Sequence, residues 1–278
     1  MKTSRFLKQV LITGCLSVLS FSLYSQEVQE NKNFQPHSGQ EGKDVVWVPT
    51  TQALVDRMLD MAKITPKDFL IDLGSGDGRT VITAAKRGTY AKGIEYNPDM
   101  VALSVLNAKR EGVSDKAEFV EADLFEADLS KATVITLFLL PEINLRLRPV
   151  ILNLKPGTRI VSNTFTMEEW IPDYTTDIDD EETNFNTAFM WIVPAKVDGI
   201  WSMQQGELRL IQIFQVVSGT LKSEKKETAI INGKLNGNNL NFYLDDVEYT
   251  GRVDGDVIKG TLTSGGKTSD WTANRKDN

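Results

Sequence analysis

The chain has 278 residues, of which 41% are hydrophobic and 25% charged, with a formal net charge of -7. This composition is typical of globular proteins, and the length suits one substantial domain and a small one. The acidic balance and the lack of a basic stripe argue against a nucleic-acid binder. The chain has one histidine, His37, and one cysteine, Cys15. These counts exclude Ser-His-Asp and Cys-His hydrolases and zinc sites of histidine or cysteine, so no metal site is predicted.

Residues 1–25 have the layout of a secretory signal peptide, with three basic residues before an apolar run over 10–24 that ends at Ser25. The run is shorter than the about 20 residues that a spanning helix needs, so no stable membrane span is expected after cleavage. Residues 26–44 are polar and without periodicity, which predicts a linker. We therefore expect export, to the periplasm or outside the cell. A lipoprotein tethered through Cys15 and a cytoplasmic location are the alternatives.

Strand-like and helix-like segments alternate over 45–194, which predicts a doubly wound, Rossmann-like α/β domain. The expected strands are 69–72, 91–95, 117–121, 133–140, 159–163 and 186–193. The expected helices are one capped by Thr50 or Thr51, 79–86, 98–111, and one through Leu145 and Leu154. The run 133–140 is apolar throughout its second half, as in a strand that is buried on both faces.

A glycine-rich loop joins the first of these strands to the following helix, with the sequence Asp72-Leu-Gly74-Ser75-Gly76-Asp-Gly78. Ligands of doubly wound sheets bind at the carboxyl ends of the strands, where glycines let the backbone come close to a ligand. A P-loop would end in Gly-Lys-Ser/Thr, and a dinucleotide fingerprint would need a third glycine where Arg79 stands. The pattern Asp-x-Gly-x-Gly-x-Gly instead predicts a site for S-adenosylmethionine (SAM).

Acidic residues at the ends of the next two strands fit the same cofactor. Glu95 ends the second strand, where a carboxylate can accept hydrogen bonds from both ribose hydroxyls. Asp123 and Leu124 follow the third strand, where the carboxylate can accept from the adenine amino group and the apolar side chain can cover the ring. The order and spacing of Asp72, Glu95 and Asp123 therefore predict SAM as the cofactor.

Several segments resemble one family, and they are Val46-Trp-Val-Pro49-Thr50, 72–79, Gly93-Ile-Glu95, 132–140 and 154–162. They are similar to the archaeal broad-specificity protein lysine methyltransferases and to the mitochondrial lysine methyltransferases that modify the ATP-synthase c-subunit and the adenine nucleotide carrier. The resemblance covers about 45–172, about half of the chain. It implies that Val48, Pro49 and Thr50 lie over the cofactor, that the segment after the fourth strand borders the acceptor, and that lysine ε-amino groups are the substrate.

Candidate catalytic groups are few. An amine must be neutral to attack a methyl group, so a lysine with a pKa of about 10.4 needs desolvation or a proton acceptor. Glu142 and Asn163 are the candidates, although a carboxylate that stabilises a helix start is the other interpretation of Glu142. The catalytic base stays unassigned. The acidic stretch 173–182 is interpreted as a solvated loop, with attraction of basic protein substrates as the alternative.

The sequence thus predicts a SAM-dependent N-methyltransferase whose acceptor is a protein lysine. A small-molecule acceptor is one alternative. An exported, non-catalytic protein that binds SAM or another nucleoside is the second, since cells make SAM in the cytosol.

The pattern changes over 196–278 to short alternating strands, with an Asn-Gly turn at 236–237 and an Asp-Gly turn at 254–255. Such dipeptides are strong signals for β-hairpins. We expect a small all-β domain, an antiparallel meander of seven or eight strands that forms a barrel or a sandwich. Trp201 and Trp271 are expected in its core.

Overall fold

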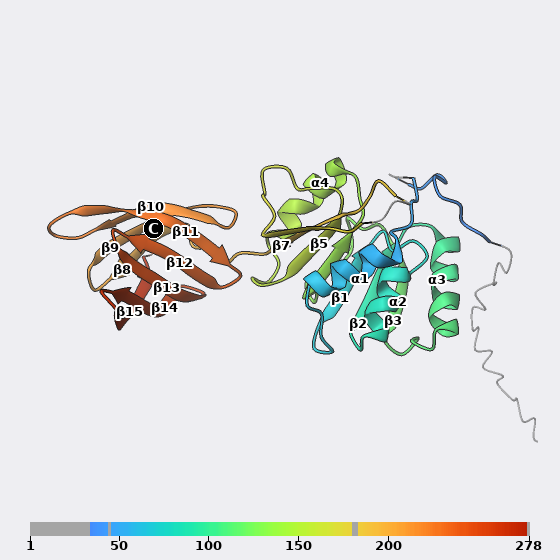
Figure 1. The fold of residues 1–278 in the computed structure, drawn as a ribbon, viewed down its shortest axis with the longest axis horizontal. Helices are drawn as coiled ribbons and strands as arrows, with labels where there is room; N and C mark the ends of the chain where they lie inside the picture. Colours follow the sequence, from blue (N-terminus) through green and yellow to red (C-terminus); the bar gives the residue numbers. More distant parts are fainter. Residues whose placement is uncertain (1–33, 44–45, 180–182, 277–278) are drawn as a thin grey trace, which may run out of the picture. The chain divides into compact units, whose positions relative to one another are not determined.

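The computed structural model describes residues 34–43, 46–179 and 183–276, so the predicted signal peptide at 1–25 lies outside the described residues. Its strands form two systems, an open seven-stranded sheet and a closed eight-stranded barrel (Figure 1). The predicted fold class, a doubly wound α/β domain followed by a small antiparallel β-domain, is confirmed. Among the described residues, no helix combines the length and the apolar character that crossing a membrane requires.

The open sheet has the strand order β3-β2-β1-β4-β5-β7-β6. Its strands are β1 (Phe69–Leu73), β2 (Tyr90–Glu95), β3 (Ala117–Glu121), β4 (Val134–Leu137), β5 (Arg159–Asn163), β6 (Tyr174–Asp177) and β7 (Thr187–Ile192). Strands β1 to β5 pair in parallel, whereas β7 runs antiparallel to β5 and to β6. The chain order reverses between β1 and β4, and ligands of such sheets bind in the crevice at this point.

Helices cover both faces of this sheet, and they are α1 (Gln52–Met61), α2 (Arg79–Lys86), α3 (Pro98–Arg110) and α4 (Pro141–Ile151) (Figure 1). Successive side chains of a strand point to opposite faces. Accordingly, Leu70 of β1 packs in one hydrophobic cluster with α1 and α2, whereas its neighbour Ile71 packs in another with α4. The start of α3 is fixed by the side chain of Asn97, which accepts hydrogen bonds from the backbone of Asp99 and Met100.

Two segments of the sheet differ from the sequence prediction. The apolar run 133–140 was expected to be one strand, but β4 ends at Leu137, which pairs with Leu73 at the end of β1. Beyond this pair β1 ends and the chain turns at Gly74, so 138–140 do not pair with β1 and leave the sheet. Their apolar character instead reflects the cavity that they line.

The acidic stretch 173–182 was expected to be a loop, but part of it forms β6. This strand pairs with β7 from Tyr174 opposite Met190 to Asp177 opposite Thr187. It is the edge strand, so its polar side chains remain at the surface while its backbone is paired on one side. The hydroxyl of Thr187 donates to the carboxylate of Asp177 at 2.6 Å, which holds the two strands together at this end.

The closed barrel is a meander of eight antiparallel strands, at the upper end of the predicted number. They are β8 (Gly199–Met203), β9 (Gly206–Ile213), β10 (Val216–Lys222), β11 (Glu227–Asn236), β12 (Asn239–Leu244), β13 (Val247–Asp254), β14 (Val257–Ser264) and β15 (Lys267–Arg275). Trp201 and Trp271 are buried in its core, as predicted. A Cβ on Gly251 would come within 2.7 Å of the Trp271 ring, so this glycine makes room for the indole.

The predicted hairpin turns are present, but each is placed one residue later than the sequence indicated. Asn236 pairs with Asn239, so the two loop residues are Gly237 and Asn238 rather than Asn236 and Gly237. In the second hairpin Asp254 pairs with Val257, so the two loop residues are Gly255 and Asp256. The glycine supplies the positive φ at the first loop position, +57° at Gly237, which explains why the Asn-Gly signal marked the right place.

Candidate active site

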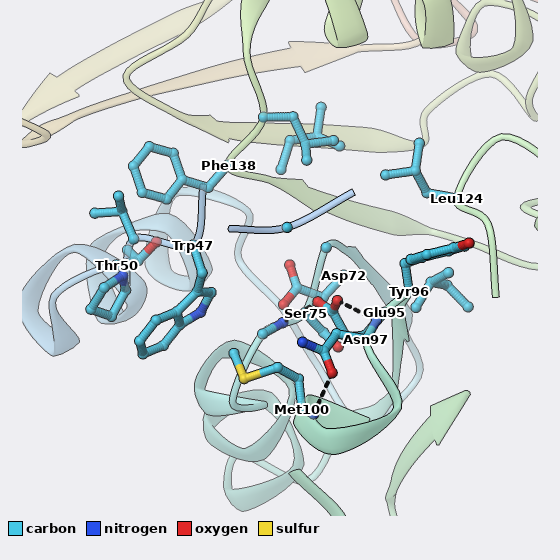
Figure 2. A pocket seen from close by; sticks show the side chains of 18 of the residues that line it. Trp47, Thr50, Asp72, Ser75, Glu95, Tyr96, Asn97, Met100, Leu124 and Phe138 are labelled. Carbon is cyan, nitrogen blue, oxygen red and sulfur yellow. Dashed lines mark hydrogen bonds between the residues drawn. The ribbon is translucent and has the colours of Figure 1, made fainter. Parts of the chain in front are cut away.

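A cavity lies at the carboxyl ends of β1, β2 and β4, where the strand order reverses (Figure 2). It is lined by nearly all of the predicted cofactor residues, which are Val48, Pro49, Thr50, Asp72, Gly74, Ser75, Gly76, Glu95, Asp123 and Leu124. Gly78, the last glycine of the loop, does not line the cavity and packs against Phe119 and Ser104 instead. The structure thus brings predicted residues from four separate segments around one space.

The loop after β1 needs its glycines because of backbone angles and close contacts. Gly74, Gly76 and Gly78 have φ angles of +76°, +54° and +84°, in the left-handed region that favours glycine. A Cβ on Gly76 would lie 2.4 Å from Nε1 of Trp47, and one on Gly78 would lie 2.7 Å from the Phe119 ring. Gly78 therefore permits close packing of the loop, while Gly74 and Gly76 form part of the cavity wall.

Asp72, the last polar residue of β1, is 7% exposed. Burial raises the pKa of this carboxyl from 3.8 to about 7; a hydrogen bond from Thr136 opposes the rise, and the charges of Glu95 and Asp77 add to it. The Thr136 hydroxyl donates to Oδ1 at 2.6 Å. Because a nearby positive charge favours the ionised form of a carboxyl, a cationic ligand in the cavity will ionise Asp72 near neutral pH.

Glu95, at the end of β2, is held by two backbone groups. Its Oε2 accepts from the amide of Gly76 and its Oε1 from the amide of Asn97, both at 2.9 Å. These bonds fix the carboxylate between the glycine loop and α3, and each oxygen retains a lone pair for a further donor such as a ribose hydroxyl. Beside it, the hydroxyl of Ser75 is buried at the cavity wall without a partner. Both groups fit a ligand that is rich in hydroxyl and amino groups.

Asp123 lines the cavity just after β3, which is two strands away from β1 in the sheet order. Its Oδ1 accepts from the amide of Phe125 at 2.9 Å, and its Oδ2 accepts from Nζ of Lys43 at 2.5 Å. The hydrogen bond from Lys43, together with that from Phe125, lowers the pKa of the Asp123 carboxyl. The ammonium of Lys43 also lies 4.6 Å from the centre of the Tyr96 ring. Sequence reasoning missed Lys43 and Tyr96, because no motif marks them.

Residues 40–43 and 46–50, which we call the strap, line the cavity. Gln40 and Trp47 form an isolated antiparallel bridge, in which the Trp47 amide donates to the Gln40 carbonyl at 2.9 Å. Its far end is fixed to α2, because Nη1 of Arg79 donates to the carbonyl of Thr50 at 2.7 Å. Trp47 was part of the motif that indicated the strap, although its contact with Gly76 was not foreseen.

The two catalytic candidates both lie outside the lining of the cavity. Glu142 is exposed in the first turn of α4, the position at which a carboxylate stabilises the helix dipole. Asn163 is fully buried at the end of β5, and its Nδ2 donates to the Thr50 hydroxyl at 3.1 Å. Asn163 therefore acts on the cavity by orienting Thr50, and neither candidate is placed as a catalytic base.

The two sides of the cavity differ in chemistry. Leu124 and Tyr96 lie on one side and Phe138, Thr50 and Trp47 on the other, with the carboxylates of Asp72 and Glu95 between them (Figure 2). Phe165 and Phe185 pack against Phe138, and Leu139, Leu140 and Ile143 also line the cavity. We call Phe138, Phe165 and Phe185 the aromatic wall. No group of three or more acidic, histidine or cysteine side chains that could hold a metal ion occurs in the part of the chain that the structure describes.

Comparison with known proteins matches this site to methyltransferases. The family model described as the ANTKMT methyltransferase domain matches residues 72–174. A protein-lysine N-methyltransferase of Saccharolobus islandicus is 40% identical over 152 residues, which cover 54% of this chain and 94% of the relative. The human lysine N-methyltransferase of the ATP-synthase c-subunit is 35% identical over 131 residues, which cover 47% of this chain and 56% of that protein. The chain thus spans about half of the human relative's length.

A solved structure adds the cofactor. The crystal structure of an RNA methyltransferase from Salinibacter ruber in complex with S-adenosyl-L-homocysteine is 47% identical, with a TM-score of 0.51, and the match covers 54% of this chain and 96% of that one. S-adenosyl-L-homocysteine is what remains of SAM after methyl transfer. SAM is therefore the cofactor of this chain, in agreement with the glycine loop and the fixed carboxylate of Glu95. The chain belongs to the family of SAM-dependent protein-lysine N-methyltransferases.

Proposed function

We propose that this enzyme transfers the methyl group of SAM to the ε-amino group of lysine residues in a protein. The observation that carries the proposal is the 40% identity with a protein-lysine N-methyltransferase, which extends over 94% of that relative. The cavity supports it, because the aromatic wall is apolar and suits the aliphatic stem of a lysine. Lysine is the amino acid that presents a primary amine at the end of such a stem.

RNA is the second candidate acceptor, because the Salinibacter relative carries the name of an RNA methyltransferase. RNA binding depends on basic residues that neutralise phosphates. This chain has 38 acidic residues against 31 basic ones, and its net charge of -7 opposes contact with a polyanion. The charge therefore favours a protein acceptor.

The residues of the cavity divide the work of binding and orientation. The bound cofactor supplies an activated methyl group on a sulfonium sulfur. In this proposal Glu95 binds the ribose of the cofactor, Asp123 binds the adenine, and the glycine loop lets the backbone come close to the rest of the cofactor. Their position in the cavity lining supports these roles. Orientation itself contributes much of the rate in an in-line displacement, so activity does not require Glu142 or Asn163 to act as a base.

The test measures where the methyl group goes. The purified chain is incubated with SAM labelled in its methyl group and with either poly-L-lysine and whole-cell protein or total RNA. We expect label in protein, recovered as methyl-lysine after acid hydrolysis, and no label in RNA. Glu95→Ala should abolish the incorporation, whereas Asp115→Ala, at an exposed position of the same domain, should leave it unchanged.

Other outcomes of this experiment identify the alternatives. Label in RNA and none in protein would replace lysine by RNA as the acceptor. Binding of SAM without label in either material would favour a small-molecule acceptor or the non-catalytic nucleoside-binding protein.

We also propose that the enzyme acts after export, since residues 1–25 have the composition of a signal peptide. Mass spectrometry of the protein recovered from cell fractions tests this. A chain that begins at Gln26 in an extracytoplasmic fraction supports export, and cytosolic recovery with Met1 intact contradicts it.

A further inference from the structure

We propose that the aromatic wall of Phe138, Phe165 and Phe185 is the binding site for the acceptor side chain, which holds the methylated ammonium by cation–π contact. This inference rests on the proposed function. Phe138 lies in a segment that carried the family resemblance, whereas Phe165 and Phe185 were marked by no motif. A cation over the face of an aromatic ring is attracted by the ring quadrupole, and methylated ammonium groups are bound in this way.

The three rings form one cluster. The centroids of Phe138 and Phe165 lie 6.0 Å apart with the rings nearly parallel, at 22°. Phe185 lies 5.2 Å from Phe138, edge to face at 66°, and 6.1 Å from Phe165. All three are half-buried and line the cavity. In the described part of the chain, none of them belongs to the hydrophobic clusters that hold the sheet and its helices together. Core packing therefore does not account for this cluster.

The strand order places the aromatic wall on the acceptor side of the cofactor site. One edge of the sheet is formed by the carboxyl ends of β3, β2, β1, β4 and β5 and by the start of the antiparallel β7. The residues at these strand ends or just beyond them are, in this order, Asp123, Glu95, Asp72, Phe138, Phe165 and Phe185. The carboxylates thus occupy one half of the edge and the rings occupy the other. With adenine at Asp123 and ribose at Glu95, the reactive end of the cofactor lies toward the rings.

A strained turn sets the position of Phe165. Its amide donates to the carbonyl of Asn163 at 2.6 Å, so these residues form a γ-turn around Thr164, which has a φ of +58°. A positive φ is uncommon for a β-branched residue and costs free energy. The turn is held by the Thr164 amide, which donates to the Thr187 carbonyl at 2.7 Å, and by Asn144 of α4, which donates to the Thr166 carbonyl at 3.2 Å. Backbone strain of this kind persists mainly at functional sites.

The chemistry of lysine methylation fits such a wall. The lysine ammonium first releases a proton to water, and the lone pair of the neutral amine then forms the new N–C bond. The C–S bond breaks with its electron pair passing to sulfur, which leaves S-adenosyl-L-homocysteine and an N-methylated ammonium. The apolar rings exclude water from the attacking nitrogen, and their faces stabilise the cation that results.

Two probes of equal shape test the cation–π contact directly. Nα-acetyl-Nε,Nε,Nε-trimethyl-lysine methylamide carries a positive charge, and its isostere with a carbon in place of Nε is neutral. Each is titrated by NMR into the full chain saturated with S-adenosyl-L-homocysteine. We expect the cationic probe to bind more tightly than the neutral one. The affinity for the cationic probe should fall on the order of 3- to 30-fold in each of Phe138→Leu, Phe165→Leu and Phe185→Leu. Phe189→Leu, at a half-buried phenylalanine of β7 outside the cavity, is the matched control and should bind as the wild type.

Equal binding of the two probes, unchanged binding by all three variants, or no binding by the wild type would overturn the inference. The affinity for S-adenosyl-L-homocysteine, measured by calorimetry on the same samples, shows whether each variant is folded and should stay within about twofold. A wild type that binds S-adenosyl-L-homocysteine but neither probe refutes the aromatic wall alone. A folded wild type that does not bind S-adenosyl-L-homocysteine refutes the proposed function as well.

Discussion

Replacing Asp72 by asparagine will make the stability of the ligand-free chain less dependent on pH. The pKa of this buried carboxyl is about 7 in the folded chain against 3.8 for an ordinary aspartate. Between these values the folded chain binds one proton more than the unfolded chain, so its free energy of unfolding falls as pH rises from about 4 to about 7. At about 1.36 kcal/mol for each pH unit, the loss is on the order of 4 kcal/mol. Asparagine cannot ionise and does not incur this loss.

Urea unfolding of the wild type, Asp72→Asn and Asp115→Asn between pH 4 and pH 8.5 measures the effect. The free energy of unfolding of Asp72→Asn, minus that of the wild type, should grow with pH by up to about 4 kcal/mol and level off above pH 7. Asp115→Asn removes an exposed carboxyl and should show no such rise. A difference between Asp72→Asn and the wild type that stays constant over this range would refute the reasoning from burial.

Three further substitutions probe the site and the barrel. Thr136→Val removes the hydroxyl that donates to Asp72, so the pKa of Asp72 should rise further above about 7; a carboxyl-carbon NMR titration that shows no rise contradicts this. Lys43→Ala frees an oxygen of Asp123, and because exposed ion pairs are worth about 0.2–1 kcal/mol, S-adenosyl-L-homocysteine should bind about 1.5- to 5-fold more tightly by calorimetry. Weaker binding would mean that Lys43 contacts the cofactor. Trp271→Ala should destabilise the barrel by about 3–5 kcal/mol in urea unfolding and leave cofactor affinity unchanged; a parallel loss of affinity would contradict independent domains.

The elements predicted best from the sequence are those whose ends are marked by turn residues next to them in the chain. The helix Arg79–Lys86 and the strand Arg159–Asn163 have the predicted bounds, because a glycine loop precedes the first and a Pro-Gly turn precedes the second. Glu95 was identified because it ends a strand at a fixed distance from the glycine loop. In these cases the neighbours along the chain are also the neighbours that determine the structure.

The acceptor side was beyond sequence reasoning because it is assembled from distant segments. Phe165 and Phe185 stand in stretches without periodicity, and only the pairing of β7 with β5 brings them together. The contact between Lys43 and Asp123 joins residues 80 positions apart. The apolar run at 138–140 was interpreted as strand because burial in a cavity wall and burial in a sheet give the same pattern.

The division of the sheet edge into a carboxylate half and an aromatic half has a consequence for how such an enzyme can evolve. The residues that we propose for acceptor binding follow β4 and β5 and precede β7, whereas the predicted cofactor residues of the sheet lie in or just after β1, β2 and β3. None of the hydrogen bonds described above for Glu95 and Asp123 comes from the acceptor set. Substitutions in the loops after β4 and β5 and before β7 can therefore change the acceptor while the methyl donor stays the same.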